Sequence, residues 1–236
     1  MQQIGVKFYD EFLMKIPRLE VESIAATILS HLHKLDSGYS LVIAGGYRRG
    51  KRESGDVDVI VSHPSEEKTL FLIGELVMRL EKAQLITHTL TISSQNSKRD
   101  QQPLPWRGMH TKGSGFDTLD KALVVWQTPG AKISGQSSVA SPHRRVDIII
   151  SPWKTVGCAV LGWSGGTTFQ RDLRRYCKME RKLKFDSSGV RSREDGMWLD
   201  LETRVGKAPL TMEEAERRVF ESLELPWRSP EERCTG

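Results

Sequence analysis

Residues 41–61, LVIAGGYRRGKRESGDVDVIV, decide the fold of this chain. An apolar run ends at a glycine pair, passes through a basic turn and continues as SGDVDVIV. Because side chains alternate between the two faces of a strand, we expect Asp56 and Asp58 to point the same way. Two carboxylates held side by side are costly unless a cation lies between them. The pattern therefore predicts a strand that presents a site for a divalent cation.

The residues just before this strand suit a phosphate group. Glycines allow the backbone to approach an anion closely, and the turn carries four basic residues, Arg48, Arg49, Lys51 and Arg52. Carboxylates beside a phosphate cradle indicate nucleotide chemistry. The alternative is an acidic strand edge after a basic loop, but the glycines, arginines and aspartates arriving together favour the site.

The totals describe an ordinary globular protein with a mild basic excess. The chain has 236 residues, of which 38% are hydrophobic and 28% are charged, so it can bury a core as one large domain or two small ones. A net charge of +5 is weak support for a polyanionic partner. The three cysteines have no metal-ligand or disulfide spacing, which predicts a reducing compartment. No apolar run approaches the roughly 20 residues that span a bilayer, so we expect a soluble intracellular protein with no membrane partner.

Apolar spacing predicts an α+β fold, with a mixed β-sheet and flanking helices followed by a small helix-rich domain. Strands are expected at residues 41–44, 57–61, 85–92, 121–127 and 145–150. Helices are expected on both sides of Pro17 and at residues 68–84, 154–161, 169–183 and 212–223. Polar residues 93–115 are expected to form a disordered surface insertion. The character of the chain changes near Pro152, which predicts a linker at 1–17, a sheet domain at 18–152 and a helical domain at 153–236.

A third carboxylate would complete a two-metal site. Such a site needs bridging carboxylates that keep the two metals roughly 3.5 to 4 Å apart. Asp147 is the only acid in the apolar segment RRVDIII at 144–150. Alone, it would be a surface residue at a strand start, but beside Asp56 and Asp58 it becomes the expected third ligand. A set of oxygen ligands suits Mg²⁺ or Mn²⁺ rather than zinc.

Several motifs resemble family X DNA polymerases, the group of polymerases beta, lambda and mu and terminal transferase. The motifs are GGYRRG at 45–50, SGDVDV at 54–59, RRVDI at 144–148, GWSG at 162–165, FQRDLRRY at 169–176 and LPWRSPEER at 225–233. They occur in the family's order and spacing and cover nearly the whole chain. The resemblance implies that the sheet domain is a polymerase palm and the helical domain a thumb.

The resemblance also implies a role for each matching residue. It implies that the catalytic metal ligands are Asp56, Asp58 and Asp147. It places five residues around the triphosphate of the incoming nucleotide, namely Gly45, Gly46, Arg49, Ser54 and Gly55. Arg18 matches a family arginine that reaches the triphosphate, and the alternative is a solvated residue after Pro17.

The second half of the chain supplies the remaining implied contacts. Gly162 and Trp163 stand where polymerases beta and lambda have a tyrosine that crowds the 2′ position of the sugar, so tolerance of ribonucleotides is expected. Gln170 falls near the minor-groove edge of the nascent pair. Three arginines of a basic helix are expected to bind DNA, namely Arg171, Arg174 and Arg175. The long polar segment 128–143 matches a palm loop that permits work on poorly paired primers.

The expected function is therefore that of a DNA-directed DNA polymerase, a nucleotidyltransferase that uses Mg²⁺ or Mn²⁺. Its partners would be a primer-template with gapped or broken ends, dNTPs and rNTPs, and repair proteins bound through N-terminal domains that this chain lacks. The expected location is nuclear if the source is eukaryotic. Alternatives are another nucleotidyltransferase of the same fold and a catalytically weak scaffold that binds DNA ends.

Overall fold

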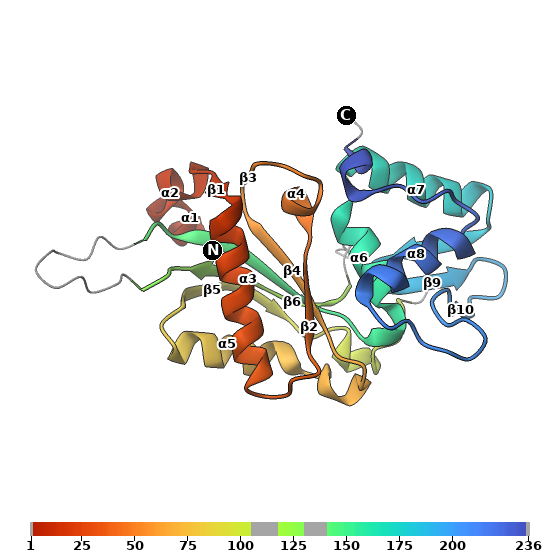
Figure 1. Ribbon diagram of the computed structural model, residues 1–236, viewed down its shortest axis with the longest axis horizontal. Coiled ribbons are helices and arrows are strands. Elements are labelled where there is room, and N and C mark those ends of the chain that lie inside the picture. Colours follow the sequence, from red (N-terminus) through yellow and green to blue (C-terminus); the bar gives the residue numbers. More distant parts are fainter. Residues whose placement is uncertain (1, 105–117, 130–140, 235–236) are drawn as a thin grey trace, which may run out of the picture.

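The computed structural model describes residues 2–104, 118–129 and 141–234. Its elements form a sheet domain with five strands and a second domain of helices and a small sheet, for which we keep the expected names palm and thumb (Figure 1). The thumb elements, coloured cyan to blue in Figure 1, gather at one side of the palm sheet. The α+β class expected from the sequence is confirmed.

The palm sheet has the strand order β2-β4-β7-β6-β5. Only the neighbours β4 and β7 run parallel, whereas the other three pairs are antiparallel. The register of the parallel pair sets Asp58 directly beside Asp147. The strands are β2 (Ser40–Ile43), β4 (Val57–Ser62), β5 (Ile86–Ser93), β6 (Asp120–Trp126) and β7 (Arg144–Ile150).

Side-chain alternation gives this sheet two different faces. Val57, Val59 and Val61 of β4 pack against α3 (Arg18–His33) and α5 (Leu72–Lys82) in one core. Ile60 and Ile149 point the other way and pack against α6 (Val156–Ser164) and α8 (Met212–Ser222) in a second core. Asp58 and Asp147 alternate in step with Ile60 and Ile149, so they belong to the face that the thumb covers.

The thumb combines helices with a three-stranded sheet of order β10-β9-β8. Its core contains Leu161 of α6, Leu173 of the helix at residues 167–179 and Phe220 of α8. Helix α8 begins at a true cap, because the Thr211 hydroxyl accepts a hydrogen bond from the Glu214 N–H at 3.1 Å. The other thumb elements are α7 (Thr167–Met179), β8 (Leu183–Asp186), β9 (Gly189–Ser192) and β10 (Trp198–Leu199).

Short elements surround the predicted phosphate turn. Helix α4 (Gly45–Arg48) follows β2 directly, and the two-stranded ribbon of β1 (Ile16–Pro17) and β3 (Glu53–Ser54) closes the turn from the other side. Helices α1 (Gln2–Lys7) and α2 (Tyr9–Leu13) lie at the N-terminus.

The helix predicted at 68–84 is shorter than its apolar pattern. Helix α5 begins only at Leu72, because Phe71 adopts a left-handed conformation with φ of 54°. Leu70, which falls within the predicted range 68–84, lies before α5 and is 38% exposed. The five predicted strands are confirmed to within two residues at each end.

One expectation from the sequence is wrong. The described part of the polar segment 93–115 is not a loose insertion, because Asn96, Ser97 and Gln101 are buried. The helix-rich thumb is confirmed, and it also contains a small sheet that the sequence did not predict, although the β8–β9 turn Asp186–Gly189 has the polar, glycine-containing sequence typical of a hairpin. Within the described ranges, no helix is long and apolar enough to cross a membrane.

Candidate active site

The three aspartates come from adjoining segments of two parallel strands. Asp58 and Asp147 are partners in the register of β4 and β7, and Asp56 just before β4 forms an ion pair with Arg145 of β7. The pKa of Asp58 is raised to about 8, first by burial and then by the neighbouring carboxylates of Asp56 and Asp147, against the opposing charges of Arg49 and Arg145. Negative charge is therefore in excess at this edge of the sheet, and a bound cation would relieve it.

The donor set fits a hard divalent cation in its chemistry, since carboxylate oxygens are the ligands that Mg²⁺ and Mn²⁺ prefer. Over residues 2–104, 118–129 and 141–234, however, the acidic, histidine and cysteine side chains form no group of three spaced to hold a metal. The Arg145 guanidinium supplies the positive charge at Asp56 in this arrangement.

Gly45 is the residue that lets the phosphate turn lie against this acidic edge. Its φ of +56° is left-handed, and a Cβ at this position would come 1.9 Å from Oδ2 of Asp58. A side chain here would therefore displace the Asp58 carboxylate. At Gly46, by contrast, the nearest atom to a Cβ would be Cδ of the flexible Lys51 side chain, at 3.2 Å, and Oγ of Ser54 would lie at 3.9 Å.

A cavity of about 420 Å³ opens between the palm turn and the thumb. This volume suits a small-molecule ligand. Nine residues singled out in the sequence line it, namely Gly45, Gly46, Arg49, Asp56, Asp58, Gly162, Trp163, Gln170 and Arg174. Two further residues line the cavity without having been predicted, Gly165 and Thr167, although the glycine pair before a helix start at GWSGGTT is a signal for a ligand-facing turn.

Asp147 and three of the predicted nucleotide contacts lie outside the lining. Arg18 donates to the carbonyls of Tyr47 at 2.9 Å and Lys51 at 3.1 Å, and its guanidinium lies 3.7 Å from the centre of the Tyr47 ring. It therefore braces the phosphate turn instead of being solvated. Ser54 is buried behind Gly46, and a Cβ on Gly55 would meet open space.

The arginines of α7 divide into two groups. Arg171 and Arg175 are exposed on the outer face of the helix. Arg174 is half-buried in the cavity wall, where desolvation lowers its pKa to about 10. It lies close to Gln170, whose amide donates to the Leu161 carbonyl at 2.6 Å and accepts from Arg174 at 3.4 Å. Arg174 therefore lines the cavity, whereas Arg171 and Arg175 form the outer basic face of α7.

Gly162 touches the thumb hairpin as well as the cavity. A Cβ at Gly162 would lie 3.0 Å from Cβ of Ser187, in the turn between β8 and β9. The turn therefore forms part of the support behind this wall of the cavity.

A buried ionic network that the sequence did not predict fastens the thumb to the phosphate turn. Arg48 of α4 donates to both oxygens of Glu216 on α8, at 2.9 and 2.8 Å, and to the Ser164 hydroxyl at 2.8 Å. Arg233 reaches the same carboxylate at 2.6 Å, and both Glu216 and Arg233 have no exposed surface. The sequence has no local pattern that predicts this network, because its members are far apart in the chain.

Comparison with known proteins agrees with this geometry. Residues 15–153 match the family model described as DNA polymerase beta palm, and residues 159–234 match the one described as DNA polymerase beta thumb. Over 98% of its length the chain is 29% identical to DNA polymerase lambda of Rattus norvegicus, of which it covers 35%.

Two human proteins are also similar. The chain is 26% identical to DNA nucleotidylexotransferase over 99% of its length and 25% identical to DNA-directed DNA/RNA polymerase mu over 98%. It covers 43% and 44% of these two proteins, so it spans less than half the length of the relatives it matches. The chain belongs to the DNA polymerase beta family, known as family X, and carries the palm and thumb of that family.

Proposed function

We propose that this chain is the nucleotidyl-transfer core of a DNA polymerase that adds dNTPs to the 3′-hydroxyl of a primer. One observation carries the proposal: a single cavity combines the acidic edge at Asp56 and Asp58, the turn residues Gly45, Gly46 and Arg49, and the basic thumb helix α7. The names of the relatives, which include polymerases lambda and mu, support DNA and nucleotides as substrates.

The residues around the cavity have different roles in the proposed reaction. The backbone of Gly45 and Gly46 and the guanidinium of Arg49 bind the triphosphate, with Arg18 keeping the turn in shape. Asp56, Asp58 and Asp147 would hold Mg²⁺, which when bound supplies neutralisation of the triphosphate and acidifies the primer hydroxyl. Catalysis then depends mainly on positioning and on the complementary charge around the transferring phosphoryl group. Exposed Arg171 and Arg175 bind the DNA backbone.

Tolerance of ribonucleotides is the finer part of this proposal. The glycine at position 162 leaves the cavity wall without a side chain next to Trp163. We expect rNTPs to be incorporated with an efficiency within about 100-fold of that for dNTPs, a difference that modest steric contacts produce. Measured kcat/KM values for both substrate classes would check this, and strong rejection of rNTPs would contradict it.

Extension of poorly paired primers is a second, more specific part of the proposed function. It was predicted from the loop at 128–143, of which residues 130–140 lie outside the described residues. Deleting residues 130–140 should lower extension of unpaired ends more than extension of gapped DNA. Equal activity on unpaired ends after the deletion would remove this part of the proposal. The two substrates also separate a role in end joining from one in gap filling.

The main proposal is tested by primer extension on gapped DNA with Mg²⁺. Asp147→Asn removes the charge of one proposed ligand, and we expect it to reduce extension on the order of 100-fold or more while DNA binding persists. Asp10→Asn is the matched control. Asp10 is exposed on α2, so this substitution removes the same charge at a position away from the cavity. A wild-type protein that binds DNA without extending it would favour the scaffold alternative.

A further inference from the structure

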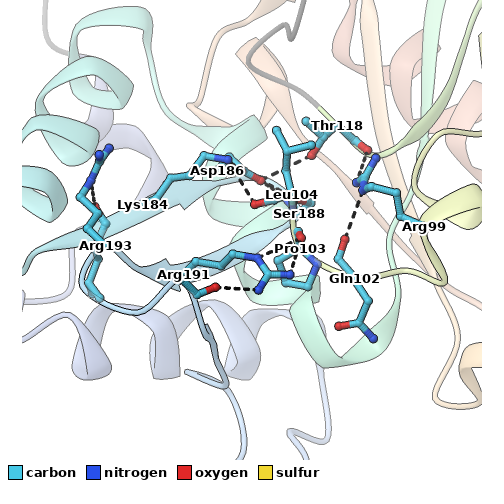
Figure 2. A network of polar contacts seen from close by, with 12 residues as sticks. Arg99, Gln102, Pro103, Leu104, Thr118, Lys184, Asp186, Ser188, Arg191 and Arg193 are labelled. Carbon is cyan, nitrogen blue, oxygen red and sulfur yellow. Dashed lines mark hydrogen bonds and ion pairs between the residues drawn. The ribbon is translucent and has the colours of Figure 1, made fainter. Parts of the chain in front are cut away.

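A polar segment of the palm, residues 94–104, runs from the end of β5 to the thumb sheet, and we name it the strap (Figure 2). Its first half is fixed to the palm by a buried carboxylate. Asp120 of β6 accepts hydrogen bonds from the N–H groups of Asn96 at 2.7 Å and Ser97 at 3.1 Å. Asp120 is 1% exposed, so these bonds are shielded from water.

A second set of bonds seats the strap on the segment that precedes α5. Gln101 accepts from the Thr69 hydroxyl at 2.6 Å and donates to the Glu66 carbonyl at 2.9 Å. The Ser97 hydroxyl accepts from the N–H of Phe71 at 2.9 Å. The strap is thus part of the rigid palm and not a tether of variable shape.

The other end of the strap is held by the thumb. Arg191 of β9 donates from Nε and from a terminal nitrogen to the Pro103 carbonyl, at 3.1 and 2.9 Å. The Leu104 N–H donates to the Ser188 hydroxyl at 3.2 Å, and Lys184 donates to the Leu104 carbonyl at 3.2 Å. Figure 2 shows these side chains converging on Pro103 and Leu104 from both strands of the hairpin.

The contact is also close sterically. A Cβ on Gly189 would lie 2.8 Å from Cγ of Pro103, and Gly189 has a φ of +132° that favours glycine. The hairpin turn therefore presents bare backbone to the strap.

The same turn reaches the nucleotide cavity on its other side. Ser187 follows Asp186 at the turn and lies against Gly162, which lines the cavity. A continuous line of packed groups therefore runs from the strap through Ser188 and Ser187 to Gly162.

From this line of contacts we infer that the strap positions the cavity wall at Gly162, with Arg191 as the positioning residue that fastens it. The inference rests on the proposed nucleotide-binding role of that cavity. While Arg191 holds Pro103, the hairpin turn is kept against Gly162. The wall beside the sugar of the nucleotide is then preformed before substrate binds.

The test compares Arg191→Ala with Arg193→Ala. Arg193 is the matched control because its Nε donates to the Leu183 carbonyl, within the hairpin itself, at 2.9 Å. Arg191→Ala should raise the KM for dNTP roughly tenfold, the effect of losing one charge-assisted pair of hydrogen bonds, with a smaller change in kcat. Arg191→Lys should recover part of the loss, because it can donate one of the two bonds.

Amide hydrogen exchange provides the readout that does not need catalysis. In Arg191→Ala, exchange should rise in peptides covering 94–104 and 161–164, whereas Arg193→Ala should leave both near wild-type values. Ser188→Ala, which removes a single strap bond, should produce the same changes at smaller size and covers the case in which Arg191→Ala fails to fold.

Unchanged exchange at 161–164 in Arg191→Ala, or equal changes in Arg193→Ala, would overturn the inference. If the wild-type protein had no polymerase activity but Arg191→Ala still increased amide exchange as expected, the proposed function would be refuted. The inference about the strap would then still hold.

Discussion

At the scale of single residues, the site depends on places where a side chain has no room. Gly45 is the clearest case, since its left-handed backbone and its contact with Asp58 both require glycine. Gly45→Ala should reduce primer extension on the order of 100-fold, because the added methyl displaces a carboxylate that must be positioned precisely. Steady-state extension kinetics on gapped DNA would measure the loss.

The control for this change is Gly74→Ala, on α5. A Cβ on Gly74 meets open space, so alanine should stabilise the helix slightly and leave extension unchanged. If Gly45→Ala kept wild-type activity, the close packing of the phosphate turn on Asp58 would have no part in catalysis.

Residue-level prediction from the sequence was most effective where spacing is local. The two-residue spacing of Asp56 and Asp58 and the apolar strand around Asp147 were sufficient to place all three at one edge of the sheet. The sequence could not separate Arg174 from Arg171 and Arg175, because burial of one arginine depends on how α7 meets the palm. It also could not show that Arg18 binds carbonyls of the turn, since those acceptors are backbone atoms.

At the scale of elements, helix α6 connects palm and thumb and begins at an unusual cap. The Glu202 carboxylate, which is buried, accepts the N–H groups of Gly157 at 2.8 Å and Cys158 at 3.0 Å. Burial raises the pKa of Glu202 to about 8, even though both backbone bonds oppose the shift.

This shift makes the cap sensitive to pH. The raised pKa means that the folded protein holds the Glu202 proton more tightly than the unfolded chain, whose value is 4.5. The proton-linked stability is therefore complete below pH 4.5 and is lost as the pH rises to about 8. Glu202→Gln should be less stable than wild type by about 1 kcal/mol at pH 5, because the amide accepts only one of the two bonds well.

The difference in unfolding free energy between wild type and Glu202→Gln should shrink as the pH rises towards 8.5. Urea denaturation of both proteins at several pH values would measure it. A difference that stays constant from pH 5 to 8.5 would mean that Glu202 does not titrate in this range.

Elements were predicted well from apolar spacing and poorly where polar groups are buried. The five palm strands and the helices α5 to α8 follow from periodicity that a local window contains. The strap lacks such periodicity, and it is ordered by partners such as Asp120 and Thr69 that lie 23 to 32 residues away in the chain. Long-range hydrogen bonds of this kind leave no local pattern.

At the scale of the whole molecule, the palm and thumb are joined by the strap and by the network around Glu216. Glu216→Ala would leave the Arg48 and Arg233 guanidinium groups without their shared carboxylate, in surroundings where desolvation already lowers the pKa of Arg233. We expect a loss of about 3–5 kcal/mol in stability, the cost of leaving buried charges unpaired. Chemical denaturation would measure this loss.

Glu213→Ala, an exposed change on the same helix, is the control and should alter stability by less than about 0.5 kcal/mol. Equal stability of the two variants would show that the network does not fasten the thumb. The sequence could not predict this ionic contact, since Arg48 and Glu216 are 168 residues apart in the chain.

Nucleotidyl transfer at the acidic edge of the palm sheet is the proposed activity of this chain. Primer elongation and pyrophosphate release should be measured together in a single turnover on gapped DNA, for wild type and Asp58→Asn. We expect one pyrophosphate for each nucleotide added, only when a divalent cation is supplied, and a loss on the order of 100-fold or more in Asp58→Asn. Undiminished elongation by Asp58→Asn, or pyrophosphate release without elongation, would contradict it.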